Sequence, residues 1–369
     1  MNLELDDEQV ALRDTLRRFL VERASVSGHV RPMLDDPTGT TEAVWRGLAD
    51  LGATGVLVPA EFGGAGMTMV DAGIVAEELG AALHPGPWLS TAVASARALT
   101  RVGGQPAAGI LARIADGTSK VAVAGLGEQS PASGECPQQK PLVSTRNEGF
   151  RVCSPPLAAP DAEAADVLLV WDGTELFAVE SAAAGVSVTP ERGIDPTRKQ
   201  FRVELDNASA QRLGTLSADD LQAVTDDVLI AAAADALGAA STVMHTAIEY
   251  AKTRTQFGAP IGSFQAIQHL CVDMFETVEL ARSGVIHALW AAENSPQERH
   301  LAALRARAFA ERLATVGDTA IQVFGGIGYT WEHDAHLYLK RLLSWSAFLG
   351  SSDRYLTEVG AHLAKKGQR

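Results

Sequence analysis

The stretch RTQFGAPIGSFQAIQH, residues 254–269, interrupts a part of the chain that otherwise has the periodicity of long helices. Gly258, Pro260 and Gly262 are residue types that favour turns, so the stretch predicts a tight connection between two helices. Arg254 and Phe257 add a cation and an aromatic ring to the same span, which also fits a loop that binds a ligand. The residues alone leave both interpretations open.

Helical patterns flank this stretch on both sides. Ser217 is a candidate N-cap with Asp220 three residues on, a variant of the capping box, and an Ala-rich pattern then runs to about residue 254. A helix of that span would be about 57 Å long at about 1.5 Å per residue. Further helical patterns follow at 264–293, 297–322 and 334–367. Residues 215–369 are therefore expected to form a C-terminal four-helix bundle.

The N-terminal third of the chain has the same character. Apolar residues recur at helical intervals in three segments, 6–24, 42–51 and 70–82. This spacing predicts an N-terminal α-helical domain over residues 1–119.

A β-rich pattern separates the two helical regions. Between residues 120 and 214, short β-rich runs alternate with turn residues; the runs are KVAVAG, ADVLLVW, ELFAVE, VSVTP and FRVEL. VWDGTELF predicts a hairpin that turns at Asp172 and Gly173, whereas the Pro- and Ala-rich segment 148–166 is expected to be a loop. The middle of the chain is thus a small β domain, and the whole order predicts an α+β fold.

Charge and composition exclude several classes of function. The formal net charge is -14 with a pI near 5.1, and no cluster of Lys or Arg offers a surface for a nucleic-acid backbone. The acidic N-terminus does not resemble a signal peptide, and no apolar run of about 20 residues predicts a membrane span. The chain has three widely spaced cysteines, Cys136, Cys153 and Cys271. This spacing suits reduced thiols in a cytosol better than a disulfide framework or a zinc site. We expect a cytoplasmic protein without nucleic-acid or membrane partners.

Three separate stretches resemble one family, the acyl-CoA dehydrogenases. They are PAEFGGAGMTMVDAGIVAEELG at 59–80, YAKTRTQFGAPIGSFQAIQH at 250–269 and QVFGGIGYTWEHDAHLYLKR at 322–341. The resemblance covers nearly the whole chain, and the RxxFGxPI and QxxGGxG elements at their mutual spacing are specific. It implies the acyl-CoA dehydrogenase fold, FAD as cofactor, and an acyl-CoA substrate. The implied reaction is α,β-dehydrogenation, with a carboxylate removing the α proton and flavin accepting the β hydride.

The resemblance also implies which residues contact the cofactor. In the family, the RxxF and QxxGG elements lie at the diphosphate and adenosine of FAD, which carries over to Arg254, Phe257, Gln322 and Gly326. A guanidinium matches phosphate oxygens, and glycine permits close backbone approach. The alternative for the same four residues is an ordinary role in turns and packing.

This chain departs from the family at the catalytic glutamate. That position aligns with Leu349 in FLGSS, residues 348–352, where Ser351 still offers a hydroxyl to the flavin. A minority of the family places the glutamate on the long helix instead, and that position is Val228 here. Asp235 lies two turns further along the same predicted helix face, among small apolar residues. Desolvation by these residues would raise the pKa of its carboxyl toward the value that a general base needs. We predict Asp235 as the catalytic base, with a structural hydrogen-bonding role as the alternative.

The middle domain departs as well. Where relatives hold the flavin ring with a TEPxxGSD-like segment and a tryptophan, this chain has AGLGEQSPASG at 124–134 and PPLAAPDAEAAD at 155–166, which are degenerate flavin-ring motifs. Glu332, His333, Asp334 and His336 suggest a metal site, but their spacing also fits caps and surface contacts, so no metal is expected.

These departures predict that the chain works with a partner. Asp235 and Arg254 are about 28 Å apart along one helix, too far for both to serve one FAD. The combination resembles the heteromeric α2β2 acyl-CoA dehydrogenases of actinobacterial steroid and cholesterol side-chain degradation, in which a related subunit holds the flavin ring. A steroid side-chain acyl-CoA is the implied substrate, and electron-transfer flavoprotein is a candidate acceptor. The alternatives are an inactive scaffold subunit, which Leu349 would permit, and an acyl-CoA oxidase, whose relatives run longer.

Overall fold

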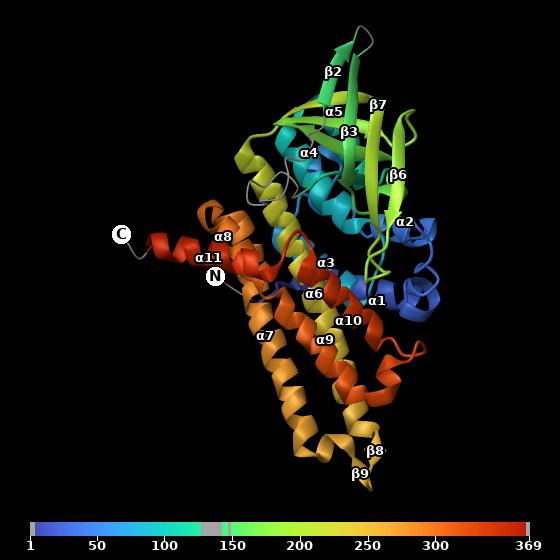
Figure 1. The fold of residues 1–369 in the computed structure, drawn as a ribbon, viewed down its shortest axis with the longest axis vertical. Coiled ribbons are helices and arrows are strands. Elements are labelled where there is room, and N and C mark those ends of the chain that lie inside the picture. Colours follow the sequence, from blue (N-terminus) through green and yellow to red (C-terminus); the bar gives the residue numbers. More distant parts are fainter. Residues whose placement is uncertain (1–3, 127–141, 147–148, 367–369) are drawn as a thin grey trace. The chain divides into compact units, whose positions relative to one another are not determined.

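The computed structural model describes residues 4–126, 142–146 and 149–366 (Figure 1). The chain forms two compact units that each combine separate parts of the sequence. Unit 1 consists of Met1–Gly28, Gly73–His84 and Leu229–Arg369, and unit 2 of His29–Ala72 and Pro85–Val228. The predicted domain boundaries at 119 and 214 follow the sequence rather than these units, and they stay a prediction.

Unit 2 is built on a seven-stranded sheet with the order β1-β4-β5-β7-β3-β2, and β6 also pairs with β7. The strands are β1 (Val121–Val123), β2 (Leu142–Arg146), β3 (Gly149–Ala158), β4 (Val167–Asp172), β5 (Glu175–Glu180), β6 (Val186–Glu191) and β7 (Gln200–Thr215). Only the β1–β4 pair is parallel among the described strands. All five predicted β-rich runs are strands, which confirms the β character of the middle region.

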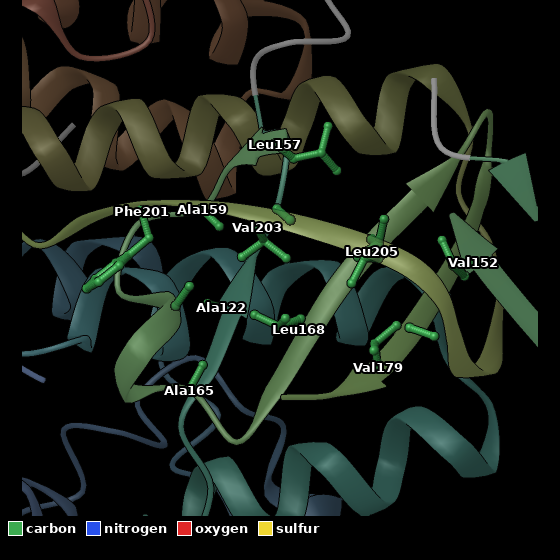
Figure 2. Packing of buried hydrophobic residues seen from close by; sticks show 14 residues of the cluster. Ala122, Val152, Leu157, Ala159, Ala165, Leu168, Val179, Phe201, Val203 and Leu205 are labelled. Carbon is green, nitrogen blue, oxygen red and sulfur yellow. The ribbon is translucent and has the colours of Figure 1, made fainter. Parts of the chain in front are cut away.

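Alternation of apolar residues along the strands builds the core of unit 2. Val203 and Leu205 of β7 face the same side as Leu168 of β4 and Val179 of β5, and all four are buried (Figure 2). Phe201 completes the cluster at one end of β7. Burial of one such side chain stabilises the fold by about 1.5–3 kcal/mol, so this cluster holds the strands in register.

The structure corrects two details of the β region. The prediction of a loop over 148–166 is wrong for Gly149–Ala158, which is β3. Pro155 and Pro156 fall where the β3–β7 register shifts, between Ser154 and Leu157, so the prolines occupy an irregularity that needs fewer ladder donors. The predicted hairpin is confirmed, but Asp172 pairs with Glu175, so its two loop residues are Gly173 and Thr174.

Short helices complete unit 2. They are the π-helical turn η1 (Val26–Val30, which begins in unit 1), α2 (Glu42–Asp50), η2 (Ala60–Phe62), the π-helical η3 (Leu89–Ser95), α4 (Ala96–Val102), α5 (Gly104–Ala115) and η4 (Ala162–Ala164). Thr91 and Ser95 of η3 donate their hydroxyls to the Val121 carbonyl oxygen at 3.1 Å each, which fixes the edge strand β1.

The described residues of unit 1 are helical apart from one small hairpin. Its elements are α1 (Asp7–Arg23), α3 (Met69–Ala81, from Gly73 on), α6 (Ala218–Thr253, from Leu229 on), β8 (Thr255–Gln256), β9 (Ala259–Pro260), η5 (Ile261–Ser263), α7 (Gln265–Asn294), α8 (Pro296–Ala308), α9 (Ala310–Phe324), η6 (Gly325–Tyr329), α10 (Ala335–Ala347) and α11 (Ser352–Lys366). Helix α9 packs against both α7 and α10, and the β8–β9 hairpin lies where α6 ends and α7 begins (Figure 1).

The long helix α6 agrees with its prediction. Asp220 donates its backbone N–H to Ser217 Oγ at 3.1 Å, and its carboxylate accepts the Ser217 backbone N–H at 3.1 Å, so the capping box is formed. The two later helical patterns are each divided. The pattern at 297–322 becomes α8 and α9, which meet at Phe309, and the pattern at 334–367 becomes α10 and α11.

Two glycines bring α3 and α6 into backbone contact within unit 1. A Cβ at Gly80 would overlap the carbonyl oxygen of Asp235, and a Cβ at Gly238 would overlap the carbonyl oxygen of Glu77. Any larger residue at either position would push the helices apart. The glycines therefore set the position of Asp235 relative to α3.

Among the described residues, α6 is the one helix whose length and composition would allow a membrane span. The most apolar window of this helix is 83% buried within the chain. This burial is typical of a core helix.

Candidate functional site

The predicted ligand loop forms the β8–β9 hairpin at the end of α6. Arg254 follows the last helical residue, and its carbonyl oxygen accepts the backbone N–H of Ile261 at 2.8 Å, which closes the hairpin. The side chains of Arg254 and Phe257 are exposed. Packing within the chain explains the glycine at position 262, because a Cβ there would come within 2.9 Å of the Ala251 carbonyl oxygen. The turn prediction is therefore confirmed, and the exposed side chains stay free for another role.

Phe257 is held in a conformation that costs free energy. Phe257 and Gly258 have φ angles of 53° and 81°, the left-handed pair that a two-residue type I′ hairpin requires. Glycine adopts this region freely, whereas an L-residue loses roughly 1–2 kcal/mol there. The phenyl ring is also 95% exposed, and its edge meets Phe264 with 6.1 Å between ring centroids.

Gln322 and Gly326 lie at the turn that ends α9. Gln322 is exposed in the last turn of this helix, and Gly325 has a φ of 66°, which suits a glycine. Gly326 is different, since its φ is not in the left-handed region and a Cβ would meet nothing within 4 Å. Neither backbone conformation nor packing within the described chain requires glycine at position 326.

Aromatic contacts connect these two loops. The ring of Tyr250, one turn before Arg254, lies 5.2 Å from the ring of Phe324, and Phe324 lies 4.3 Å from His333. The hairpin base and the α9 turn are therefore neighbours. Large apolar side chains on the two loops are exposed; they are Phe257, Phe264, Ile327, Tyr329 and Trp331.

The loop between α10 and α11 contains Leu349, the residue that the resemblance aligns with the family's glutamate. Leu349 and Gly350 have φ angles of 56° and 130°, so the backbone reverses sharply here. The buried Arg307 of α8 fixes this reversal by donating to the carbonyl oxygens of Ser346, Phe348 and Gly350 at 2.7–3.0 Å. Burial lowers the pKa of Arg307, but a guanidinium keeps its charge in proteins, so Arg307 remains a charged donor.

The Leu349 side chain lies against an apolar cluster of Leu229, Leu304 and Tyr355. Leu229 adjoins the second family position for the glutamate, Val228, which is also buried and apolar. Tyr355 donates its hydroxyl to the Leu349 carbonyl oxygen at 2.6 Å. Both family positions for a proton acceptor are therefore filled by packed aliphatic side chains.

Ser351 lines a cavity of about 680 Å³ between α9 and α10. The acidic side chains of Glu311, Asp318 and Asp353 line the same cavity, and no lysine or arginine of the described residues does. These formal charges would repel a diphosphate, so a cofactor contact at Ser351 would have to come from a neutral part of the cofactor.

Asp235 lies inside unit 1, where three residues of α10 meet α3 and α6. Its Oδ1 accepts the indole N–H of Trp345 at 2.5 Å and lies 3.2 Å from Nε of Arg341. Arg341 is fully buried and donates to the His84 carbonyl oxygen at 2.7 Å, while Tyr338 donates to the Ala81 carbonyl oxygen at 2.8 Å. These contacts give Asp235 a structural role, and its base role stays a prediction.

The four residues considered for a metal do not converge. Nδ1 of His333 accepts the backbone N–H of Ala335 at 3.1 Å, which caps α10, and His336 stacks on Trp331 with 4.9 Å between centroids.

The flavin-ring segment at 124–134 lies outside the described residues from position 127 on. Sequence reasoning missed Arg307, Arg341 and Trp345, because a helical pattern does not indicate which buried polar residues pair across the fold.

Two family models together match most of this chain. The model of the acyl-CoA dehydrogenase N-terminal domain matches residues 6–117, and that of the C-terminal domain matches residues 229–364. IpdE2, an acyl-CoA dehydrogenase of Mycolicibacterium smegmatis, is 31% identical over 97% of this chain and 100% of its own length. The chain belongs to the acyl-CoA dehydrogenase family.

Two further relatives extend this result. The acyl-CoA dehydrogenase FadE34 of Mycobacterium tuberculosis is 37% identical over 98% of this chain, but the chain spans only 49% of FadE34. A solved variant of the Tcur3481-Tcur3483 steroid ACAD is similar with a TM-score of 0.86 and 28% identity, over 98% of this chain and 99% of its own. The predicted family and its fold, with a helical N-terminal part, a central sheet and a helical C-terminal part, are confirmed, and FAD is the family's cofactor.

Proposed function

We propose that this chain is a subunit of an FAD-dependent acyl-CoA dehydrogenase that catalyses α,β-dehydrogenation of a CoA thioester together with a related subunit. A steroid side-chain acyl-CoA is the proposed substrate, supported by the similarity to the Tcur3481-Tcur3483 steroid ACAD. A related partner is supported by FadE34, whose length leaves room for a second unit of this size. Electron-transfer flavoprotein as acceptor, the α2β2 composition and a cytoplasmic location belong to the same proposal.

The observation that carries the proposal is Phe257. Its left-handed backbone and its 95% exposure both cost free energy. The edge contact with Phe264 buries too little of the side chain to offset that cost. A ligand or another chain that covers the ring would recover that cost. The neighbouring Arg254, Gln322 and Gly326 supply a cation, an amide and open space for close approach, which together fit a dinucleotide.

In this proposal Arg254 binds the diphosphate of FAD, Gln322 donates its amide, and Phe257 covers the apolar face of the adenosine. FAD, when bound, supplies the hydride acceptor of the reaction. Because about 28 Å of helix separates Asp235 from Arg254, these four residues would serve the FAD whose ring is held by the related subunit. Leu349 provides no proton acceptor, so the base is Asp235, through its Oδ2, or a residue of that subunit.

A glycine variant tests the cofactor site without disturbing the fold. In Gly326→Ala, the added methyl group meets nothing within 4 Å in this chain, so the isolated chain should unfold at the same denaturant concentration as wild type. In the complex co-expressed with a related subunit, FAD bound per chain should fall at least about tenfold, because the methyl group occupies the approach path.

Gly360→Ala is the matched control, since a Cβ at position 360 of α11 also meets nothing within 4 Å. It should retain FAD at the wild-type ratio. Wild-type flavin content in Gly326→Ala would refute the assignment of this turn to FAD.

A second candidate function is an inactive scaffold subunit, which the aliphatic packing around Leu349 favours. Co-expression separates the two. A yellow complex that oxidises acyl-CoA, when neither subunit does so alone, supports the dehydrogenase, and a colourless, inert complex supports the scaffold.

A further inference from the structure

Three metal-ligating side chains converge between α8 and α11, away from the residues assigned above. His300 lies on α8, and Glu358 and His362 lie one turn apart on the same face of α11. One ligand atom from each residue lies within 4.8 Å of the other two. Nε2 of His300 is 2.9 Å from Oε1 of Glu358, and the two imidazole rings are 5.9 Å apart.

We propose that His300, Glu358 and His362 bind a divalent transition-metal ion, with Zn²⁺ as the best fit, and that this ion connects α11 to α8. Two imidazole nitrogens and a carboxylate oxygen suit Zn²⁺ rather than Mg²⁺ or Ca²⁺, which prefer oxygen ligands. Three protein ligands leave a fourth tetrahedral position for water.

The observed spacing is close to what a zinc ion requires. With bond lengths of about 2.0–2.2 Å, two ligand atoms in a tetrahedral site lie about 3.4 Å apart. The three ligand atoms already lie within 4.8 Å of one another. Side-chain rotations that shift these atoms by about 1 Å would therefore complete the site. The His300–Glu358 hydrogen bond and the contact between the two imidazole rings already bring the three side chains together, so a metal ion would enter a nearly formed site.

The packing of α11 gives the metal a structural purpose. After Tyr355, the inward side chains of α11 are only half-buried, and Leu356 and Leu363 are 54% and 51% exposed. Apolar contact therefore holds the second half of this helix weakly. Tyr355, at the start of α11, donates to the Leu349 carbonyl oxygen. A metal ion that fixes α11 would thus also stabilise the loop at 348–351.

Zinc titration of the purified full-length chain tests the proposal. After removal of metals with a chelator, wild type should bind one Zn²⁺ per chain with a Kd at or below about 1 μM in calorimetry, and its melting temperature should rise with Zn²⁺. His362→Gln should bind at least about 100-fold more weakly and lose that rise, because one ligand is gone. Glu358→Gln should weaken binding while keeping the shape of the side chain.

His245→Gln is the matched control, because His245 is an exposed histidine of α6 whose Nδ1 contacts the Ser241 carbonyl oxygen at 2.7 Å. It should bind Zn²⁺ as wild type does. Metal-free His362→Gln should melt within a few degrees of metal-free wild type, which shows that it folds. Equal zinc affinity in wild type and His362→Gln, or no binding by wild type below about 100 μM, would overturn the proposal.

Discussion

Replacing Asp235 by asparagine separates its structural contacts from its predicted role as a base. The substitution keeps the size of the side chain but removes the charge opposite Arg341, which is fully buried and lies 3.2 Å from Asp235. Removing one member of a buried ion pair costs about 3–5 kcal/mol, because the remaining charge stays desolvated. Asparagine still accepts the indole N–H of Trp345, so we expect the lower part of this range.

The assay is denaturant unfolding of the isolated chain, followed by turnover of the assembled enzyme. Arg341→Met removes the other charge, and the double variant should be destabilised by less than the sum of the single variants, because it leaves no unpaired ion. Asp273→Asn, at an exposed position of α7, is the control and should unfold as wild type does.

Two results are decisive. If Asp235→Asn unfolds at the wild-type denaturant concentration, the pair does not stabilise the fold and the reasoning from burial is wrong. If folded Asp235→Asn turns over substrate at the wild-type rate, Asp235 is not the base.

Four further predictions each concern one side chain. Tyr338→Phe should destabilise the chain by about 0.5–1.5 kcal/mol in denaturant unfolding, because the hydrogen bond from the Tyr338 hydroxyl to the Ala81 carbonyl oxygen is lost. Arg307→Met should cost at least about 1.5–3 kcal/mol in the same assay and expose the Leu349 loop to proteolysis, since three carbonyl oxygens lose a charged donor. Burial lowers the pKa of His29 from 6.5, so stability should fall as the pH drops below about 6.5, and His29→Gln should flatten that dependence in unfolding curves measured at several pH values. Phe257→Gly should stabilise the isolated chain by up to about 1–2 kcal/mol by relieving the left-handed backbone, yet weaken assembly measured by size-exclusion chromatography; equal assembly would contradict a covered ring.

Local patterns in the sequence predicted local structure well. The capping box at Ser217 and the Ala-rich run after it predicted α6 to within about a residue at each end, because helix caps and periodicity act over a few residues. The turn residues of the RTQFG stretch likewise predicted a tight connection between two helices, and the β8–β9 hairpin forms that connection.

Features that depend on distant partners were not predictable in this way. Strand β3 contains Pro155 and Pro156, which argue against a strand locally, but β3 pairs with β2 before the prolines and with β7 on both sides of them. The interruption at Leu349 has no helix breaker before Gly350, and it is stabilised by Arg307 from another helix. The pairing of Asp235 with Arg341 and Trp345 joins residues far apart in the chain, whereas periodicity indicates only that Asp235 faces inward.

The discontinuity of unit 1 has a consequence for biosynthesis. The backbone contact of Gly80 with Asp235 joins residues whose synthesis is separated by about 155 amino acids, which a ribosome adds in roughly 8–30 seconds. During that interval α1 and α3 have emerged without the helices that bury them, so nascent chains should recruit chaperones until α6 and α10 appear. Slow translation of residues 85–228 would lengthen this vulnerable period, even though that part of the sequence forms the other unit.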